Sequence, residues 1–370
     1  MFAAPAGAIA EANTAALAQE IAAFLAAQPK WGALATADVS FGYKDNLLLS
    51  YADEERSAFV RGSASFLALR VPTGSVDASF FLQADGTRYF SGRAVNHDAG
   101  IWLHSEVACR RGAAFKFSLP VTGYYSDKVF DVSDTEIERF VARQKVTGGI
   151  VGPMVRWNLS ARWWLEAQAN GERQRYADGA NDARVGDGVI RVGWKPAERV
   201  ETRLIGTQRW WDFDERVQYS AAGRPLFGTA LKLTEREGQA RIEITWDADA
   251  HWQTETGVSL TEYRDNGSGY FNFRRKKAAH EVRWKNERWL VRLEGIMRRS
   301  DFEVRTVGFG IDPPLRIKDE YSAEFRVERM LNKRWTVWGG YTWERSRSND
   351  LFASYRMNEA LFGLRWSWER

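Results

Sequence analysis

Charged side chains recur at every second position over long stretches of this sequence. Arg292 and Glu294 are two residues apart, and Glu324, Arg326 and Glu328 repeat this spacing farther along the chain. Residues two apart point to the same face of a β-strand, so each run places several charges on one face. Opposite charges on neighbouring strands can brace a sheet as ion pairs, and rows of charge can also line a path for ions. Of these two interpretations we favour bracing.

Residues that could carry covalent chemistry form no recognisable motif. The single cysteine, Cys109, excludes an intrachain disulfide, and the four histidines (His97, His104, His251 and His280) are scattered along the chain. A catalytic site needs a nucleophile and a base in a suitable arrangement, and no spacing here indicates one. We therefore expect no enzyme, no metal site and no cofactor.

Charged positions alternate with apolar ones, which is the pattern of strands that have one polar and one apolar face. The end of the chain, from Glu359 to Trp368, shows this pattern in full. A charge on a lipid-facing position near the membrane midplane costs roughly 2–4 kcal/mol, so the charged faces must point inward in a membrane barrel. The apolar face of this last strand comprises Ala360, Phe362, Leu364, Trp366 and Trp368.

Turn-forming residues divide the chain from about Ala35 onward into strands. Seven short connections alternate strictly with eight longer polar ones, and fifteen connections imply sixteen strands. An antiparallel barrel with tight turns at one end and longer loops at the other produces this alternation. We predict an all-β fold: a transmembrane up-and-down antiparallel β-barrel of about sixteen strands, preceded by one short N-terminal helix.

The composition agrees with a membrane barrel. No run of about 18 or more apolar residues occurs, so no transmembrane helix is expected. Aromatic residues make up 14% of the chain and include 17 Trp, which suits two aromatic girdles at the membrane borders. The net charge of +4 comes from Lys and Arg that are spread over all strands. A nucleic-acid site would cluster them, so we expect no nucleic-acid partner.

Residues 1–34 form a separate N-terminal segment in this interpretation. The stretch 11–28 is alanine-rich and has apolar residues on one side, which predicts an amphipathic helix, and Pro29 prevents its continuation. This helix could lie in the periplasm below the barrel or plug the lumen. Residues 35–370 are assigned to the barrel.

The predicted inner face carries charges of both signs with a slight excess of positive ones. As a pore lining, such a face would give a weak preference for anions. The inward aromatic residues Phe81, Trp102, Trp164 and Trp338 could stack against sugars along a carbohydrate path, or only fill space. The residues selected as pore-lining are Lys44, Arg61, Lys116, Arg156, Arg191, Arg203, Arg209, Arg241, Glu243, Glu281, Arg283, Arg292, Glu294, Glu324, Arg326, Glu328, Trp338 and Arg365.

Both ends of the predicted barrel resemble known outer-membrane proteins. Gly363, Trp366 and Trp368 are similar to the C-terminal signal that the barrel assembly machinery of Gram-negative bacteria reads. The segment 39–47, with its Gly-Tyr-Lys-Asp-Asn run, resembles the opening strand of the β-barrel porin-2 group and of the barrel part of surface lipoprotein assembly modifiers. The resemblance implies that the assembly machinery, outer-membrane lipid and lipopolysaccharide are partners.

We therefore predict a porin-like channel of the bacterial outer membrane that passes small polar solutes. An even number of strands places both termini on the same side, which we expect to be the periplasm. Two alternatives remain open. The barrel could serve a machine that exports polysaccharide or assembles surface lipoproteins, with a periplasmic or membrane partner protein bound through the N-terminal helix. It could also be a sealed structural anchor for a partner complex.

Overall fold

The N-terminal helix expected at residues 11–28 lies outside the described residues, so the helix and the domain division after residue 34 stay predictions. Among the described residues, no helix is long and apolar enough to cross a membrane. The computed structural model describes residues 31–51, 54–70, 75–131, 141–177, 179–247, 249, 251–308 and 310–370.

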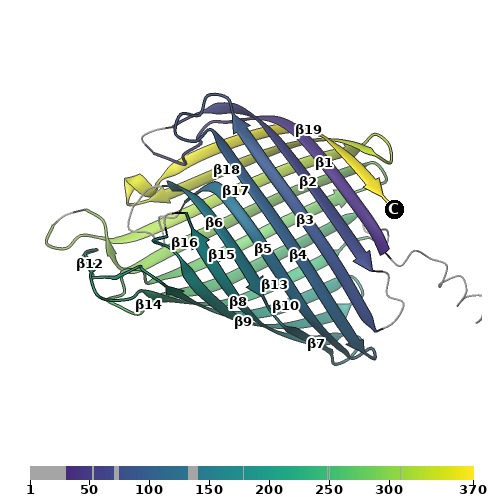
Figure 1. Cartoon of the computed structure of the whole chain (residues 1–370), viewed down its shortest axis with the longest axis horizontal. Helices are drawn as coiled ribbons and strands as arrows, with labels where there is room; N and C mark the ends of the chain where they lie inside the picture. Colours follow the sequence, from purple (N-terminus) through teal and green to yellow (C-terminus); the bar gives the residue numbers. More distant parts are fainter. Residues whose placement is uncertain are drawn as a thin grey trace, which may run out of the picture.

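Extended strands make up most of the described chain (Figure 1). Most of them have 13 to 18 residues, which exceeds the roughly 9–11 residues that cross a bilayer, so they project beyond it. One turn of 3-10 helix, η1 (Leu351–Ala353), precedes the last strand. The strands are β1 (Trp31–Lys44), β2 (Ser57–Arg70), β3 (Val76–Tyr89), β4 (His97–Arg111), β5 (Phe115–Asp131), β6 (Val141–Val151), β7 (Met154–Asn158), β8 (Trp163–Tyr176), β9 (Ala183–Ala197), β10 (Val200–Phe213), β11 (Gln218–Tyr219), β12 (Pro225–Leu226), β13 (Lys232–Thr245), β14 (Trp252–Asp265), β15 (Phe273–Lys285), β16 (Trp289–Thr306), β17 (Leu315–Met330), β18 (Trp335–Ser348) and β19 (Tyr355–Glu369).

Seventeen of these strands form one antiparallel sheet that closes on itself, because β1 pairs with β2 on one side and with β19 on the other. β6 and β7 both pair with β5 and β8 and are separated by Gly152 and Pro153. Proline has no N–H to donate, so the strand is interrupted there. Counted as one interrupted strand, β6 and β7 leave sixteen barrel strands, which confirms the predicted fold.

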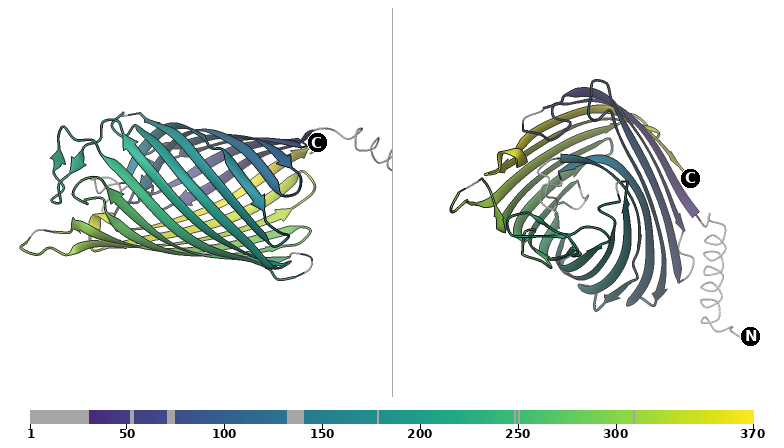
Figure 2. Two further views of the ribbon diagram at one scale, coloured as in Figure 1. Left: turned by 90° about the horizontal axis from the view of Figure 1, so that it is seen from below. Right: turned by 60° about the vertical axis from the view of Figure 1, so that its left-hand side comes forward.

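The two ends of the barrel differ in their connections. At the end where β1 begins and β19 finishes, connections run from two residues between β9 and β10 to six between β13 and β14. At the opposite end they run from six residues between β8 and β9 to eighteen between β10 and β13, which include the hairpin β11–β12. Figure 2 shows these longer loops opposite the C-terminus. We call the two ends the terminal end and the loop end.

Large apolar side chains cover the outer face of the sheet. Val39 and Phe41 of β1 and Phe362 of β19 expose 54%, 63% and 64% of their surface. Tryptophans follow the outer face near the terminal end, where Trp163 and Trp194 stack with ring centroids 5.5 Å apart. An apolar outer band bordered by aromatic rings is what a lipid-facing barrel wall requires.

Four aromatic rings inside the barrel occupy the space above a glycine on the adjacent strand. A Cβ added to Gly363 would stand 2.7 Å from the indole of Trp338 and 2.8 Å from the Cβ of Ser40. Only glycine leaves room for the ring, and the ring in turn covers a position that would otherwise weaken the strand. The directly paired residues are Gly42–Phe59, Gly148–Tyr124, Gly193–Trp164 and Gly363–Trp338.

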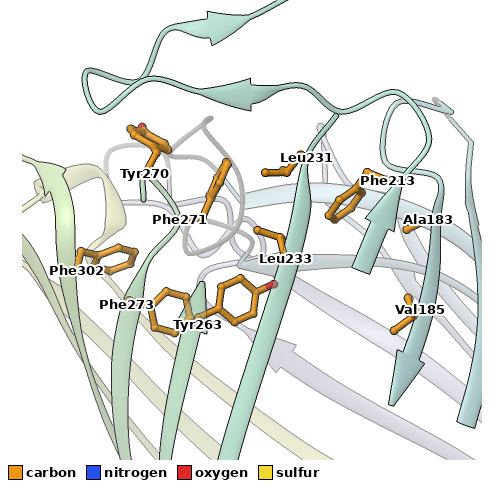
Figure 3. Close-up of a cluster of buried hydrophobic side chains, with 10 residues drawn as sticks. All are labelled: Ala183, Val185, Phe213, Leu231, Leu233, Tyr263, Tyr270, Phe271, Phe273 and Phe302. Atoms are coloured by element: carbon orange, nitrogen blue, oxygen red, sulfur yellow. The ribbon is translucent and has the colours of Figure 1, made fainter. Parts of the chain in front are cut away.

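The main apolar core lies inside the barrel near the loop end, and we call it the loop-end cluster. Tyr263 and Phe273 face inward from β14 and β15 and stack with centroids 4.9 Å apart. Tyr270 and Phe271 from the connection between these strands pack against them, as Figure 3 shows. The sequence pattern did not place apolar residues here. The cluster comprises Ala183, Val185, Phe213, Leu231, Leu233, Tyr263, Tyr270, Phe271, Phe273 and Phe302.

The substitution Gly193→Ala tests the glycine–aromatic pairs. The added methyl group would overlap the indole of Trp164, so we expect the free energy of unfolding to fall by about 1–3 kcal/mol, the usual cost of overpacking. The matched control is Gly188→Ala on the same strand, because a Cβ there meets nothing within 4 Å. Urea unfolding of the reconstituted barrel measures both variants, and equal midpoints would contradict the role given to Gly193.

Candidate functional site

Polar and charged side chains surround open space inside the barrel. One hollow of about 760 Å³ lies against β7–β10 and β13 and is lined in part by Arg156, Glu166 and Arg191. A second, of about 710 Å³, lies against β1–β5 and β16–β19 and is lined in part by Arg61 and Arg365. Side chains therefore leave solvent-sized space along two parts of the inner wall.

Six glutamates form a continuous row on the inner face. Each lies directly across from the next on the neighbouring strand, beginning with Glu201 on β10 and ending with Glu324 on β17. Alternation along one strand places a residue on this face, but only the register between strands brings the six side by side. Rows of one charge are an arrangement by which pores select ions. The row comprises Glu201, Glu243, Glu255, Glu281, Glu294 and Glu324.

Arginines beside this row neutralise most of it. Arg292 lies 2.9 Å from Glu281 and 2.6 Å from Glu294, and Arg283 also contacts Glu281, at 2.8 Å. Arg203 contacts two members of the row in the same way. These contacts favour the interpretation that the charges brace the wall. Further ion pairs of the selected cations are Arg61–Glu359, Lys116–Glu106, Arg156–Glu166, Arg191–Glu166, Arg209–Asp187 and Arg241–Glu255.

A separate network joins the first and last strands at the closing seam. The Arg365 Nε donates to Asp38 on β1 at 3.0 Å, and its Nη1 donates to Glu328 on β17 at 3.0 Å. Arg326 also donates to Glu328, at 2.6 Å, while the indole N–H of Trp338 donates to Asp38 at 3.1 Å. The network thus connects β17, β18, β19 and β1. Asp38 was not among the residues selected from the sequence, although its position between the outward residues Ala37 and Val39 indicates the inner face.

Some charges on the inner face stand outside these networks. Lys277 and Arg298 lie directly across from each other on β15 and β16. Neither has an ion-pair or hydrogen-bond partner among the described residues, and the same holds for Lys44 and for Glu344. From the sequence Lys44 was selected as pore-lining, and Arg298 and Glu344 were also expected on the inner face, whereas Lys277 was not. A charge that no direct ion pair holds can interact with a solute, so these positions are candidates for solute contact.

The inward tryptophans pack against the wall. Trp164 and Trp338 are each 7% exposed, because each covers a glycine on one side and has a guanidinium 4.1 Å from its ring centre, from Arg156 and Arg326 respectively. Stacking against a sugar needs a free ring face, so the carbohydrate-path interpretation is wrong for these two. Trp102 is 44% exposed but stacks on Tyr124 at 5.3 Å.

Gly363 of the proposed assembly signal has a packing role of its own, because Trp338 occupies the space beside it. Trp366 and Trp368 lie at the terminal end of β19, and the reading of this segment by the assembly machinery stays a prediction. Within the described chain, no group of three or more His, Cys, Asp or Glu residues is arranged to hold a metal ion.

Solved structures with the same architecture are outer-membrane barrels. OccAB4 of Acinetobacter baumannii aligns with a TM-score of 0.50 at 6% identity, over 93% of this chain and 99% of its own. OccAB1 of the same organism aligns with a TM-score of 0.50 at 9% identity, over 92% of this chain and 96% of its own. An anion-selective porin from Comamonas acidovorans reaches 0.48 at 10% identity, over 91% and 99% of the two chains.

At these identities the likeness concerns the fold alone. The chain therefore has a closed antiparallel barrel fold that OccAB4 and OccAB1 share. No protein-family model matches the sequence, and no curated protein is significantly similar to it.

Replacing Asp38 with Ala tests the seam network. The change removes the partner of Arg365 and of the Trp338 indole, so we expect the free energy of unfolding to fall by about 1–3 kcal/mol. The control is Asp212→Ala, because Asp212 and its partner Lys232 are more than half exposed and such pairs contribute about 0–1 kcal/mol. Urea unfolding measures both variants. Equal losses of unfolding free energy would show that the seam network stabilises the barrel no more than an exposed ion pair does.

Proposed function

We propose that this protein is a porin-like channel that passes small polar solutes across the bacterial outer membrane. The observation that carries the proposal is the polar, unfilled space inside a closed barrel with an apolar outer face. A barrel of 16 strands is wide enough to leave an aqueous channel. A mainly neutralised lining predicts weak charge selectivity rather than exclusion of one sign. The absence of an enzymatic activity stays a prediction.

We assign the terminal end to the periplasm and the loop end to the cell exterior. The short connections and both ends of the sheet lie together at the terminal end, and outer-membrane barrels have short periplasmic turns and longer external loops. The resemblance to the β-barrel porin-2 group and to assembly modifiers concerns the first strand only, and membership in either group stays a prediction.

Lys277 and Arg298 are the proposed contact for the anionic group of a passing solute. They lie directly across from each other on the inner face and have no ion-pair partner among the described residues. Arg298 borders a smaller hollow of about 260 Å³ that Glu324 and Glu344 also line. A solute would therefore meet uncompensated charge of both signs at this level.

A sealed anchor is the second candidate function, and the loop-end cluster is the observation that favours it. Tyr270 and Phe271 are 7% and 0% exposed and bring apolar side chains inside the barrel near its loop end. If the rest of the loop end also closed, no solute would pass. The export and assembly roles need a partner protein, and nothing in the described residues favours them over a channel.

Planar-bilayer recording of the pure protein tests the proposed channel. We expect stable conductance steps and, for Lys277→Glu, a reversal potential shifted toward cation selectivity, because the substitution changes the net charge of the pair Lys277 and Arg298 from +2 to zero. The control Arg236→Glu makes the same charge change on the exposed outer face of β13 and should leave the reversal potential unchanged. Zero conductance from folded protein would favour the sealed anchor.

Replacement of Phe271 with Ser tests whether the loop-end cluster narrows the channel. Loss of this fully buried ring loosens the connection between β14 and β15, so we expect a larger single-channel conductance and a free energy of unfolding that is lower by about 3–5 kcal/mol, as for truncation of a buried Phe. Phe90→Ser at the same end removes a ring that is 64% exposed and is the control. An unchanged conductance step would place the narrowest point elsewhere.

A further inference from the structure

Small residues leave a hollow in the outer face of the barrel between β9 and β17. Gly206 and Gly238 lie directly across from each other on β10 and β13, and a Cβ added to either would meet nothing within 4 Å. Ala240 and Ala278 continue this floor, and the whole hollow has a volume of about 1110 Å³. Its apolar lining and its size, at the upper end of small-molecule sites, allow a large hydrophobic ligand.

The hollow lies within the apolar band and its charged border lies at the loop end. Lys276 is eight residues along β15 from the outward Trp284, and Arg299 is ten residues along β16 from the outward Trp289. With a rise of about 3.3 Å per residue and a tilt of about 40°, these spacings correspond to roughly 20 and 25 Å above the Trp level. The apolar band of a barrel is about 25 Å tall, so both cations stand at its upper border.

Lys276 and Arg299 lie directly across from each other at this border. Arg299 contacts Asp301 at 3.1 Å and approaches Asp319 to 4.0 Å. Lys276 has no ion-pair or hydrogen-bond partner among the described residues. Like charges directly opposite each other destabilise a sheet unless something neutralises them, so an anion bound from the membrane side would stabilise this pair.

We propose that the hollow binds a phosphorylated glycolipid with several acyl chains, of the lipid A type. Its acyl chains lie over Gly206, Gly238 and Ala240, and a phosphate lies between Lys276 and Arg299. The hollow extends across seven neighbouring strands, which are six spacings of about 4.8 Å and hence about 29 Å of wall. That width suits a lipid with more than two chains. The loop end faces the outer leaflet in the orientation proposed above, where such a lipid resides.

A second copy of the chain fits this surface less well. Two barrels inserted in the same direction place equal heights of their walls side by side, so Lys276 of one copy would face a level where Asp301 and Asp319 are already engaged by Arg299 and where the other Lys276 also needs an anion. A lipid phosphate brings the opposite charge to that level instead. Charge complementarity therefore favours the lipid over a dimer contact.

Native mass spectrometry of the full chain in detergent tests the proposal. The probe is diphosphorylated hexa-acyl lipid A, compared with the same lipid after removal of its phosphates and with phosphatidylglycerol. We expect one bound lipid A, weakened about tenfold by Lys276→Glu, since one charge-assisted contact is worth that factor. Gly238→Leu should weaken it as well by filling the floor. The matched control, Arg175→Glu on the outer face of β8, should bind as the unaltered chain does.

Three results would overturn the proposal. If lipid A bound equally well to all three variants (Lys276→Glu, Gly238→Leu and Arg175→Glu), the bound lipid would be nonspecific lipid around the barrel. Equal binding of the dephosphorylated lipid would remove the phosphate contact. A lipid-independent dimer that Gly238→Leu dissociates would assign the hollow to a second copy. Lys276→Glu changes an exposed side chain and is not expected to disturb folding. Heat-modifiable migration in gel electrophoresis confirms that each variant is folded before its lipid binding is measured.

Discussion

Closure of the sheet between β1 and β19 is the constraint on which the rest of the structure depends. A bilayer interior offers no water to backbone N–H and C=O groups, so a spanning sheet can leave no edge. Eleven directly paired positions join the two strands, from Leu34 with Glu369 to Lys44 with Glu359. The chain adds side-chain contacts at the same place, because Arg365 connects β19 to Asp38 on β1 and to Glu328 on β17. The seam is thus held by backbone and side chains together.

The membrane makes alternation and turn counting unusually informative. A one-residue slip would move every charge of a strand into lipid, so the pattern along the last strand assigns Phe362 outward and Arg365 inward without ambiguity. Sixteen strands and the alternation of connection lengths follow from the same rule. The interruption at Pro153 was not foreseen. From the sequence alone, a single proline inside a strand cannot be distinguished from a short turn or from an uninterrupted strand.

The depth of a residue along the barrel was not predictable in the same way. Period-two alternation assigns Tyr263 and Phe273 to one face of a strand. It does not say how high along the barrel they lie or which rings of neighbouring strands they meet, because both depend on the register between strands. Trp338 illustrates the limit. Its partner, Gly363, lies 25 positions away in sequence, and the two meet only once the register of β18 and β19 is known. Without that register, the inward tryptophans read equally well as exposed stacking surfaces.

The register of β15 and β16 sets two pairs of like charges on opposite faces of one wall. Lys277 with Arg298 faces the lumen and Lys276 with Arg299 faces the membrane. Elsewhere on the inner face, opposed arginines such as Arg283 and Arg292 share a carboxylate one step away, so their repulsion is neutralised within the protein. At these two pairs the neutralisation is incomplete, at a cost of roughly 0.2–1 kcal/mol per opposed pair. A wall selected for stability alone would place a glutamate at one of these positions. Anion binding on both sides of the wall accounts for these cations. An anionic solute would bind to the pair in the lumen, and a lipid phosphate would bind to the pair that faces the membrane.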